Sequence, residues 1–241
     1  DWSSDVCSSD LSAVKAFAKA IAADDVNAAC HYNAGNSYQA LGNRAKAAAH
    51  FSKALALGMD AKAVGFILQS PTVTRYVGRI AGKWPLPVTS ADLFGGEGVA
   101  ALASDLFLRC AMEATTLAGM QLEVLLGHVR AELLRLAGEQ RRDGDDDDLI
   151  AFACALARQC FINEYVYGQT EAEAERAAAL RDRLLHDLAS NAAFTPLTLA
   201  VVAAYFPLHT LPAADALLRR EWPPTVAGLL RVQLREPREE M

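Results

Sequence analysis

The stretch AACHYNAGNSYQALGNRAKAAAHFSKALALGMDA, residues 28–61, predicts two helices joined by a tight turn. We expect the first helix at about 27–41 and the second at about 44–57. Gly42 suits the left-handed conformation that often ends a helix, because it has no Cβ to clash with the backbone. Asn43 can then cap the second helix, since its side-chain oxygen accepts a backbone N–H.

Small and aromatic residues in this stretch predict how the two helices pack. Gly35 and Ala54 carry little bulk, so the helices can approach closely at these positions. Tyr38 and Phe51 supply the bulk that fills the space beside them. The hairpin is therefore expected to bury its aromatic residues between its own helices.

The same pattern of small and aromatic residues occurs once more, by half, nearer the N-terminus. Each residue of the half copy precedes its counterpart in the full copy by 34 positions. The full copy consists of Gly35, Tyr38, Gly42, Ala47, Phe51 and Ala54, and the half copy consists of Ala13, Phe17 and Ala20. A fixed period of this length indicates a stacked helical repeat.

The period and the residue pattern resemble those of the tetratricopeptide repeat, a helix–turn–helix unit that stacks on its neighbours. The chain departs from the family pattern at Met59, where the family usually has proline. The resemblance implies about one and a half repeats. It also implies a region that binds a protein or peptide partner and performs no chemistry itself.

Four residues of the first helix are predicted to share one face and to form the partner-binding site. They are Tyr32, Asn33, Asn36 and Gln39. In the family that the stretch resembles, this face lines a concave groove in which asparagines hold peptide backbone. A carboxamide offers two donors and one acceptor oxygen, which suits that role. The alternative is that these residues are only solvated helix positions.

The first ten residues, DWSSDVCSSD, do not continue the repeat pattern. Their four serines and three aspartates interrupt any apolar stripe. The segment resembles a translated sequencing adapter. We therefore expect residues 1–10 to be an artefactual prefix and the natural sequence to begin near Leu11. The alternative is a short natural disordered tail.

The composition limits which classes of partner and which cellular compartment we expect. The chain has 241 residues, of which 52% are hydrophobic, and a formal net charge of −6. This acidic balance disfavours nucleic acid as a partner, because nucleic-acid-binding surfaces are basic. No basic start precedes an apolar run, so we expect no secretory signal and a cytoplasmic protein. The sequence leaves the oligomeric state open.

The cysteines and histidines predict no metal site and no disulfide. One cysteine, Cys7, lies in the suspected prefix. The other four form no C-x-x-C pair, so we expect buried free thiols in a reducing cytosol. These four are Cys30, Cys110, Cys154 and Cys160. The five histidines lack the H-E-x-x-H spacing of a zinc-binding helix.

The segment 188–214 contains no Asp, Glu, Lys or Arg, which raises the question of a membrane span. A spanning helix needs about 20 predominantly apolar residues, and three prolines interrupt this segment. We therefore expect a buried helix at about 196–206, capped by Thr195, and no membrane partner.

The rest of the chain predicts helix after helix, because no segment alternates apolar and polar residues as a half-buried strand would. We expect an all-α protein in which repeat hairpins pack against a C-terminal multi-helix bundle. The predicted parts are 11–83 for the repeats and connecting helices, 84–96 for a linker that begins Trp84-Pro85-Leu86-Pro87, and 97–241 for the bundle. Helices are expected at about 71–80, 97–115, 118–137, 149–167, 170–190, 212–219 and 224–235.

No segment carries a strong signal for catalysis. The glycines of residues 95–98 follow no hydrophobic strand, so they indicate a chain break rather than a nucleotide loop. The aspartates of 145–148 lack the glycine and distal glutamate of a calcium loop, and we expect Asp148 to cap the next helix. Glu164 lies among apolar residues and would need a partner if buried, either in a structural network or at a ligand.

Three C-terminal segments carry a second resemblance. They are CALARQCFINEYVY at 154–167, AAYFPLHTLPAADALL at 203–218 and EWPPTVAGLLRVQLREPREE at 221–240. Together they resemble the helical region of bacterial proteins that join tetratricopeptide repeats to a class I S-adenosylmethionine-dependent methyltransferase domain. The resemblance covers about residues 148–241 and implies that S-adenosylmethionine belongs to a domain that follows this region. No cofactor or catalytic residue is assigned within this chain.

Three functions fit these observations. The first is a non-catalytic N-terminal part of such a methyltransferase, which recruits or positions a protein partner. The second is a free-standing repeat adaptor that joins proteins. The third is a helical domain that binds a small molecule through the C-terminal half.

Overall fold

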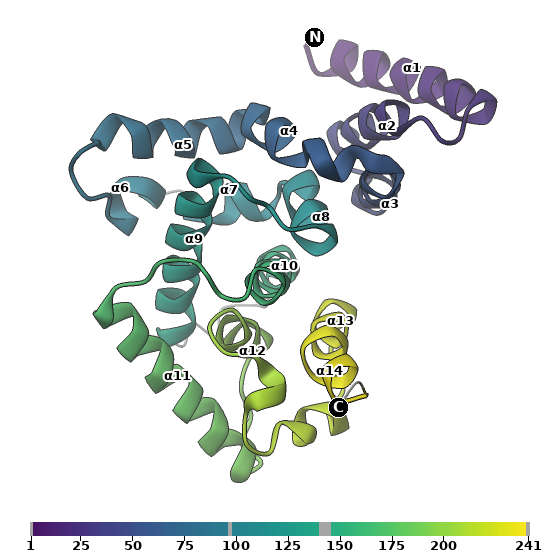
Figure 1. Ribbon diagram of the computed structural model, residues 1–241. Coiled ribbons are helices and arrows are strands. Elements are labelled where there is room, and N and C mark those ends of the chain that lie inside the picture. Colours follow the sequence, from purple (N-terminus) through teal and green to yellow (C-terminus); the bar gives the residue numbers. More distant parts are fainter. Residues whose placement is uncertain (1, 96–97, 140–145, 240–241) are drawn as a thin grey trace.

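The computed structural model describes residues 2–95, 98–139 and 146–239, and helices dominate these residues (Figure 1). No strand occurs among them, so the all-α prediction is confirmed. The α-helices are α1 Trp2–Ala23, α2 Ala28–Ala40, α3 Arg44–Ala54, α4 Ala63–Gln69, α5 Pro71–Lys83, α6 Ser90–Phe94, α7 Ala100–Ala103, α8 Leu106–Ala114, α9 Met120–Gly138, α10 Asp147–Ile162, α11 Glu171–Ala189, α12 Pro196–Ala203, α13 Pro224–Leu230 and α14 Glu236–Glu239. Short 3₁₀ or π segments occupy Leu55–Met59, Asp60–Lys62, Leu208–Thr210, Ala214–Arg219 and Arg231–Arg235.

Helices α2 and α3 form the hairpin that residues 28–61 predict. The side chain of Asn27 accepts the backbone N–H of Cys30 and caps α2. Gly42 has φ = 72°, the left-handed conformation expected at the turn. Asn43 accepts the N–H of Lys46 and caps α3, so this capping prediction is confirmed.

The two helices of the hairpin approach closely at Gly35. A Cβ placed on Gly35 would lie 2.5 Å from two ring carbons of Phe51, closer than real Cβ contacts come. Phe51 and Ala54 are both fully buried. The glycine is therefore required by the ring that packs against it, as the sequence predicts. Helix α1 packs against α2. It continues through Leu11, the position where the natural sequence is predicted to begin.

An aromatic cluster joins the hairpin to the rest of the molecule. The Phe107 ring of α8 lies 5.3 Å from the Phe51 ring and 4.9 Å from the Tyr32 ring, centroid to centroid. The Phe66 ring of α4 lies 4.8 Å from Tyr32. Nearer the surface, Arg44 donates to Asp148 at 2.7 Å across 104 positions of sequence. This ion pair links the start of α3 to the start of α10.

The segment after the hairpin contains more helix than expected. Gly58, with φ = 96°, ends the turn after α3, and α4 and α5 follow. Helix α5 begins at Pro71 as predicted. The predicted linker 84–96 includes α6, capped by Thr89, whose Leu93 and Phe94 are buried. The division of the chain into domains at this linker stays a prediction.

Two predicted helices end or break where long-range contacts compete with the helix. The helix expected at 97–115 is divided at Asp105, whose carboxylate accepts the Leu108 N–H and the Ser70 hydroxyl. The helix expected to reach 167 ends at Ile162, because Glu164 and Tyr165 adopt positive φ of 56° and 60°. The Tyr165 hydroxyl instead donates to the Ala203 carbonyl.

Smaller corrections concern the C-terminal elements. Asp146, not Asp148, caps α10, and Asp148 is instead the partner of Arg44. Thr195 caps α12 as predicted, but α12 ends at Ala203. The helix predicted near 212–219 is a 3₁₀ turn, and the one near 224–235 passes from α13 into a π turn.

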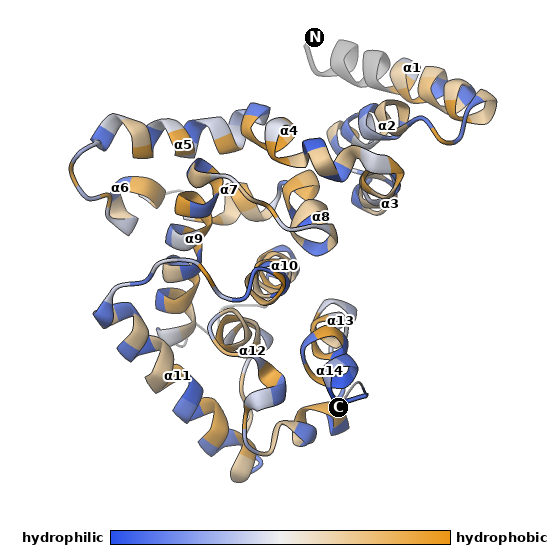
Figure 2. Cartoon of the chain, viewed as in Figure 1, coloured by the Kyte–Doolittle hydropathy of each residue, from blue (hydrophilic) through white to orange (hydrophobic). Residues whose placement is uncertain are grey.

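Helix α10 forms the centre of the bundle. It contacts α7, α8, α9, α12 and α13, and almost every residue from Ile150 to Ala157 is buried. Figure 2 shows α10 mostly in hydrophobic colours, whereas α11 carries hydrophilic segments along its length. No helix in the described part of the chain has the length and apolar content needed to cross a membrane.

Candidate functional site

One side of α2 carries four exposed residues at helical spacing, which we call the α2 stripe. They are Ala29, Asn33, Asn36 and Ala40. Asn33 and Asn36 are predicted site residues, and the structure brings them together one turn apart, both open to solvent. The flanking alanines leave room for a bound chain to reach the two carboxamides.

Tyr32 does not lie on the α2 stripe. Tyr32 lies four residues before Asn36, so it borders the stripe on the side of α2 turned about 100° from Asn33. Its half-buried ring belongs to the aromatic cluster with Phe51, Phe66 and Phe107. The structure therefore places Tyr32 where it joins α2 to α4 and α8.

Gln39 lies beside the stripe but is half-buried. Its Oε1 is shielded from solvent and accepts no hydrogen bond from the described residues. A buried acceptor without a donor costs about 1–3 kcal/mol. Of the four predicted residues, Asn33 and Asn36 are thus the two that present free carboxamides to solvent.

A histidine pair links α2 to α3 beneath the stripe. The Nδ1 atoms of His31 and His50 are 3.0 Å apart, and His31 Nε2 lies 3.1 Å from the Asp25 carbonyl. Because a carbonyl only accepts, His31 carries its proton on Nε2 and its Nδ1 accepts from His50. Burial lowers the pKa of His50, and the nearby His31 and Lys46 lower this pKa further.

A second candidate surface lies on α9, and we call it the α9 groove. Its floor is the side of α9 formed by Met120, Val124, Gly127, His128 and Ala131. Its walls are formed by residues 166–170, by the first turns of α11, and by Val88 and Ser90. The groove encloses about 640 Å³ and continues past Glu123 and Val166 into a hollow of about 300 Å³.

The α9 groove is open, and large apolar side chains are exposed among the polar residues that line it. Met120 and Val166 are 82% and 68% exposed, and Val124 and Ile162 are also exposed. All four line the groove or its continuation. A concentration of large exposed apolar residues on a folded surface indicates a contact site, whereas single ones need no explanation.

A buried ion pair holds the wall of the α9 groove in place. Arg130 Nη2 donates to Glu173 Oε1 at 3.2 Å and to the Gly168 carbonyl at 3.2 Å. The Tyr205 hydroxyl donates to the same Glu173 oxygen at 2.6 Å. Thr170 caps α11 through the Glu173 N–H, but the Glu173 carboxylate is occupied by Arg130 and does not complete a capping box.

The sequence contained a signal for this ion pair that our prediction did not use. Arg130 lies in the apolar stripe of α9, four residues after Leu126 and three before Leu133. A cation inside such a stripe requires a buried partner. Glu164, the charge that the sequence predicts to need a partner if buried, is exposed at the turn after α10 and needs none.

The thiols of the bundle are poorly suited to nucleophilic chemistry. Burial raises the pKa of Cys154 and that of Cys160 to about 12, and it also raises the pKa of Cys110. Since the thiolate is the reactive form, these groups stay protonated and inert near neutral pH. Within residues 2–95, 98–139 and 146–239, no three His, Cys, Asp or Glu side chains cluster as metal ligands would.

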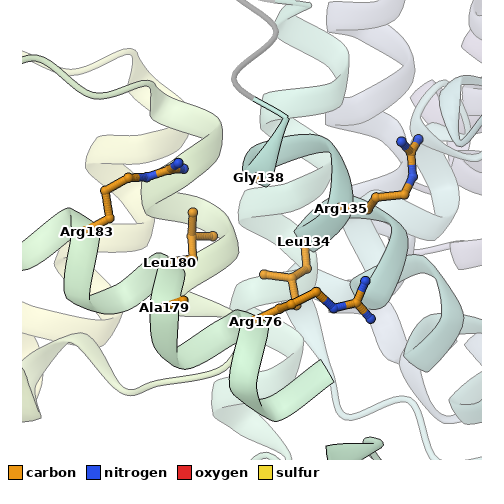
Figure 3. A pocket seen from close by; sticks show the side chains of 7 residues that line it. All are labelled: Leu134, Arg135, Gly138, Arg176, Ala179, Leu180 and Arg183. Atoms are coloured by element: carbon orange, nitrogen blue, oxygen red, sulfur yellow. The ribbon is translucent and has the colours of Figure 1, made fainter. Parts of the chain in front are cut away.

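A third hollow, between α9 and α11, encloses about 340 Å³ beside three arginines, Arg135, Arg176 and Arg183. Figure 3 shows that their guanidinium groups do not converge on one point above Leu134 and Leu180. Arg135 is paired with Glu132 and Glu139, and Arg183 donates to the Ala137 carbonyl. The arrangement therefore does not form an anion site.

Comparison of the chain with protein-family models, with curated proteins and with solved structures gave no match.

Proposed function

We propose that this chain is a non-catalytic protein-interaction region in which the α2 stripe binds a segment of a partner protein. The observation that carries the proposal is the pair of exposed carboxamides, Asn33 and Asn36, one turn apart. Each can accept a backbone N–H and donate to a backbone carbonyl, so together they can hold an extended peptide regardless of its sequence.

The proposal includes a tetratricopeptide-type arrangement of α1, α2 and α3. Supporting this are the helix–turn–helix of α2 and α3, the contact of α1 with α2, and the close approach at Gly35. In such an arrangement α1 would be the second helix of a preceding repeat. The exposed side of α2 would then face the concave side of the array.

The proposal also places the chain before a class I S-adenosylmethionine-dependent methyltransferase domain in a cytoplasmic bacterial protein. Its support is the resemblance of residues 148–241 to the helical region of such proteins. The gene decides this part: an alternating β/α pattern with a glycine-rich first loop after codon 241 supports it. A stop codon at that point would leave the adaptor as the better proposal.

Peptide selection tests the α2 stripe directly. Peptides from a random displayed library are selected on the full chain, and their affinities are measured for the wild type and for Asn33→Ala/Asn36→Ala. We expect the double variant to weaken binding at least about fivefold, since two to four hydrogen bonds of about 0.5–1.5 kcal/mol each are lost. Gln69→Ala, which removes an exposed carboxamide from α4, is the matched control. Peptides that bind the double variant as well as the wild type would place the site elsewhere.

A further inference from the structure

We infer that the α9 groove is a second docking site, which takes an amphipathic helix of a partner protein running antiparallel to α9. This site is separate from the α2 stripe, and it recognises apolar side chains and end charges rather than peptide backbone. The inference does not depend on the α2 stripe.

The floor of the groove has the spacing and length of a helix-binding surface. Met120, Val124, Gly127 and Ala131 follow one another at intervals of four, three and four residues, along one side of α9. At 1.5 Å per residue this stripe is about 16 Å long, which matches about three turns of a partner helix. Gly127 and Ala131 are small, so a second helix can approach to about the usual 8–10 Å between axes.

The apolar residues of the groove lack a partner within the described part of the chain. Met120 belongs to the floor of the groove and Val166 to a wall, and both are mostly exposed. A helix that places apolar side chains at matching intervals between them would bury both. Helix-in-groove recognition of this kind uses anchors spaced by three or four residues.

The charges that face the groove differ between its two ends. At the Met120 end the charged groups are Glu123 and Glu164, both acidic. At the Ala131 end the charged groups are Glu173 and Arg176. The Glu173 carboxylate is neutralised by Arg130, so Arg176 gives this end a positive charge. His128, between the ends, faces the groove as a half-buried ring.

These end charges select the direction of the bound helix. A helix is stabilised by acidic residues in its first turn and basic residues in its last turn. Only the antiparallel orientation places a basic last turn beside Glu123 and Glu164 and an acidic first turn beside Arg176. The partner segment is therefore expected to carry Asp or Glu, then an apolar stripe, then Lys or Arg.

Three synthetic peptides of about four turns test the inference by fluorescence anisotropy with the full chain. The first has an acidic first turn, leucines at the matching intervals and a basic last turn. The second exchanges the end charges, and the third replaces the leucines with serine. We expect the first peptide to bind, the second to bind about tenfold more weakly at low salt, and the third not to bind.

Two glycine variants show whether the peptide occupies the groove. A Cβ on Gly127 or on Gly78 of α5 meets no atom within 4 Å, so Gly127→Gln and Gly78→Gln should both fold. We expect Gly127→Gln to weaken the affinity of the chain for the first peptide at least about tenfold. Gly78→Gln should leave this affinity unchanged. Glu164→Lys should lower the affinity for the first peptide and raise the affinity for the second.

Several outcomes would overturn the inference. Equal affinities for the first two peptides, or unchanged binding by Gly127→Gln, would remove the groove as the site. Self-association of the chain that Gly127→Gln abolishes would assign the groove to a second copy instead of a partner helix. The wild type and Asn33→Ala/Asn36→Ala should bind the first peptide equally well. A result that rules out the α9 groove as a docking site therefore leaves the proposal for the α2 stripe untouched.

Discussion

The α2 stripe and the α9 groove are both uncovered sides of helices, but they differ in how the chain builds them. The α2 stripe lies on a hairpin whose caps join residues three apart, Asn27 to Cys30 and Asn43 to Lys46. The wall of the α9 groove depends on Arg130 and Glu173, which are 43 residues apart. Local chemistry thus defines the polar surface, and tertiary packing defines the apolar one.

The difference predicts where a single substitution does most damage. Arg130→Met should destabilise the chain by about 3–5 kcal/mol, because it leaves the Glu173 carboxylate buried without its cation. Urea denaturation followed by circular dichroism measures the loss. The exposed pair of Arg44 and Asp148 supplies the control, and Arg44→Met should cost at most about 1 kcal/mol.

A second substitution separates a lost ion pair from a lost side chain. Arg130→Met/Glu173→Gln removes both charges and should recover a large part of the stability lost in Arg130→Met. An equally unstable double variant would mean that the ion pair is not what holds the groove wall.

The hairpin should respond most at its closest approach. Gly35→Ala places a methyl group 2.5 Å from the Phe51 ring and should cost about 1–3 kcal/mol by overpacking. Phe51→Leu creates room at this contact, so Gly35→Ala/Phe51→Leu should be more stable than the sum of the two single effects predicts. Additive effects in urea denaturation would show that the ring and the glycine do not constrain each other.

The smallest expected effect is a pH dependence confined to the hairpin. The pKa of His50 is lower in the folded chain than its ordinary value of 6.5, so protonation favours the unfolded state. The stabilising contribution of neutral His50 is complete above about pH 6.5 and is lost as the pH falls through the lowered pKa. Thermal unfolding midpoints should therefore fall less between about pH 8 and pH 5 for His50→Gln than for the wild type. Equal pH profiles would contradict the role of this pair.

The predictions from sequence succeeded where a signal is contained within a few residues. The turn at Gly42, the caps at Asn43 and Thr195, and the start of α5 at Pro71 all follow from local backbone chemistry. Predicted helix ends failed where a distant group competes. The helix expected to reach 167 ends at Ile162, and the Tyr165 hydroxyl donates to the Ala203 carbonyl, 38 residues later.

The candidate surfaces divide in the same way. Asn33 and Asn36 could be placed on one side of α2 from helical spacing alone, because residues three apart in a helix lie on the same side. The contact of Tyr32 with Phe66 and Phe107 could not be predicted from helical spacing, because those rings come from α4 and α8. The α9 groove was not predicted, since Met120 and Val124 read equally well as buried residues.

The sequence by itself therefore determined the helical class, the N-terminal hairpin and the residues that could bind through carboxamides. Hydrogen-bonded caps, glycine conformations and helical periodicity act within one or two turns, so they can be read from the chain directly. Only the tertiary structure decided which apolar residues stay uncovered and which charges become paired inside. Burial depends on segments that arrive from elsewhere in the sequence, as when Glu173 and Tyr205 meet Arg130 beneath the α9 groove.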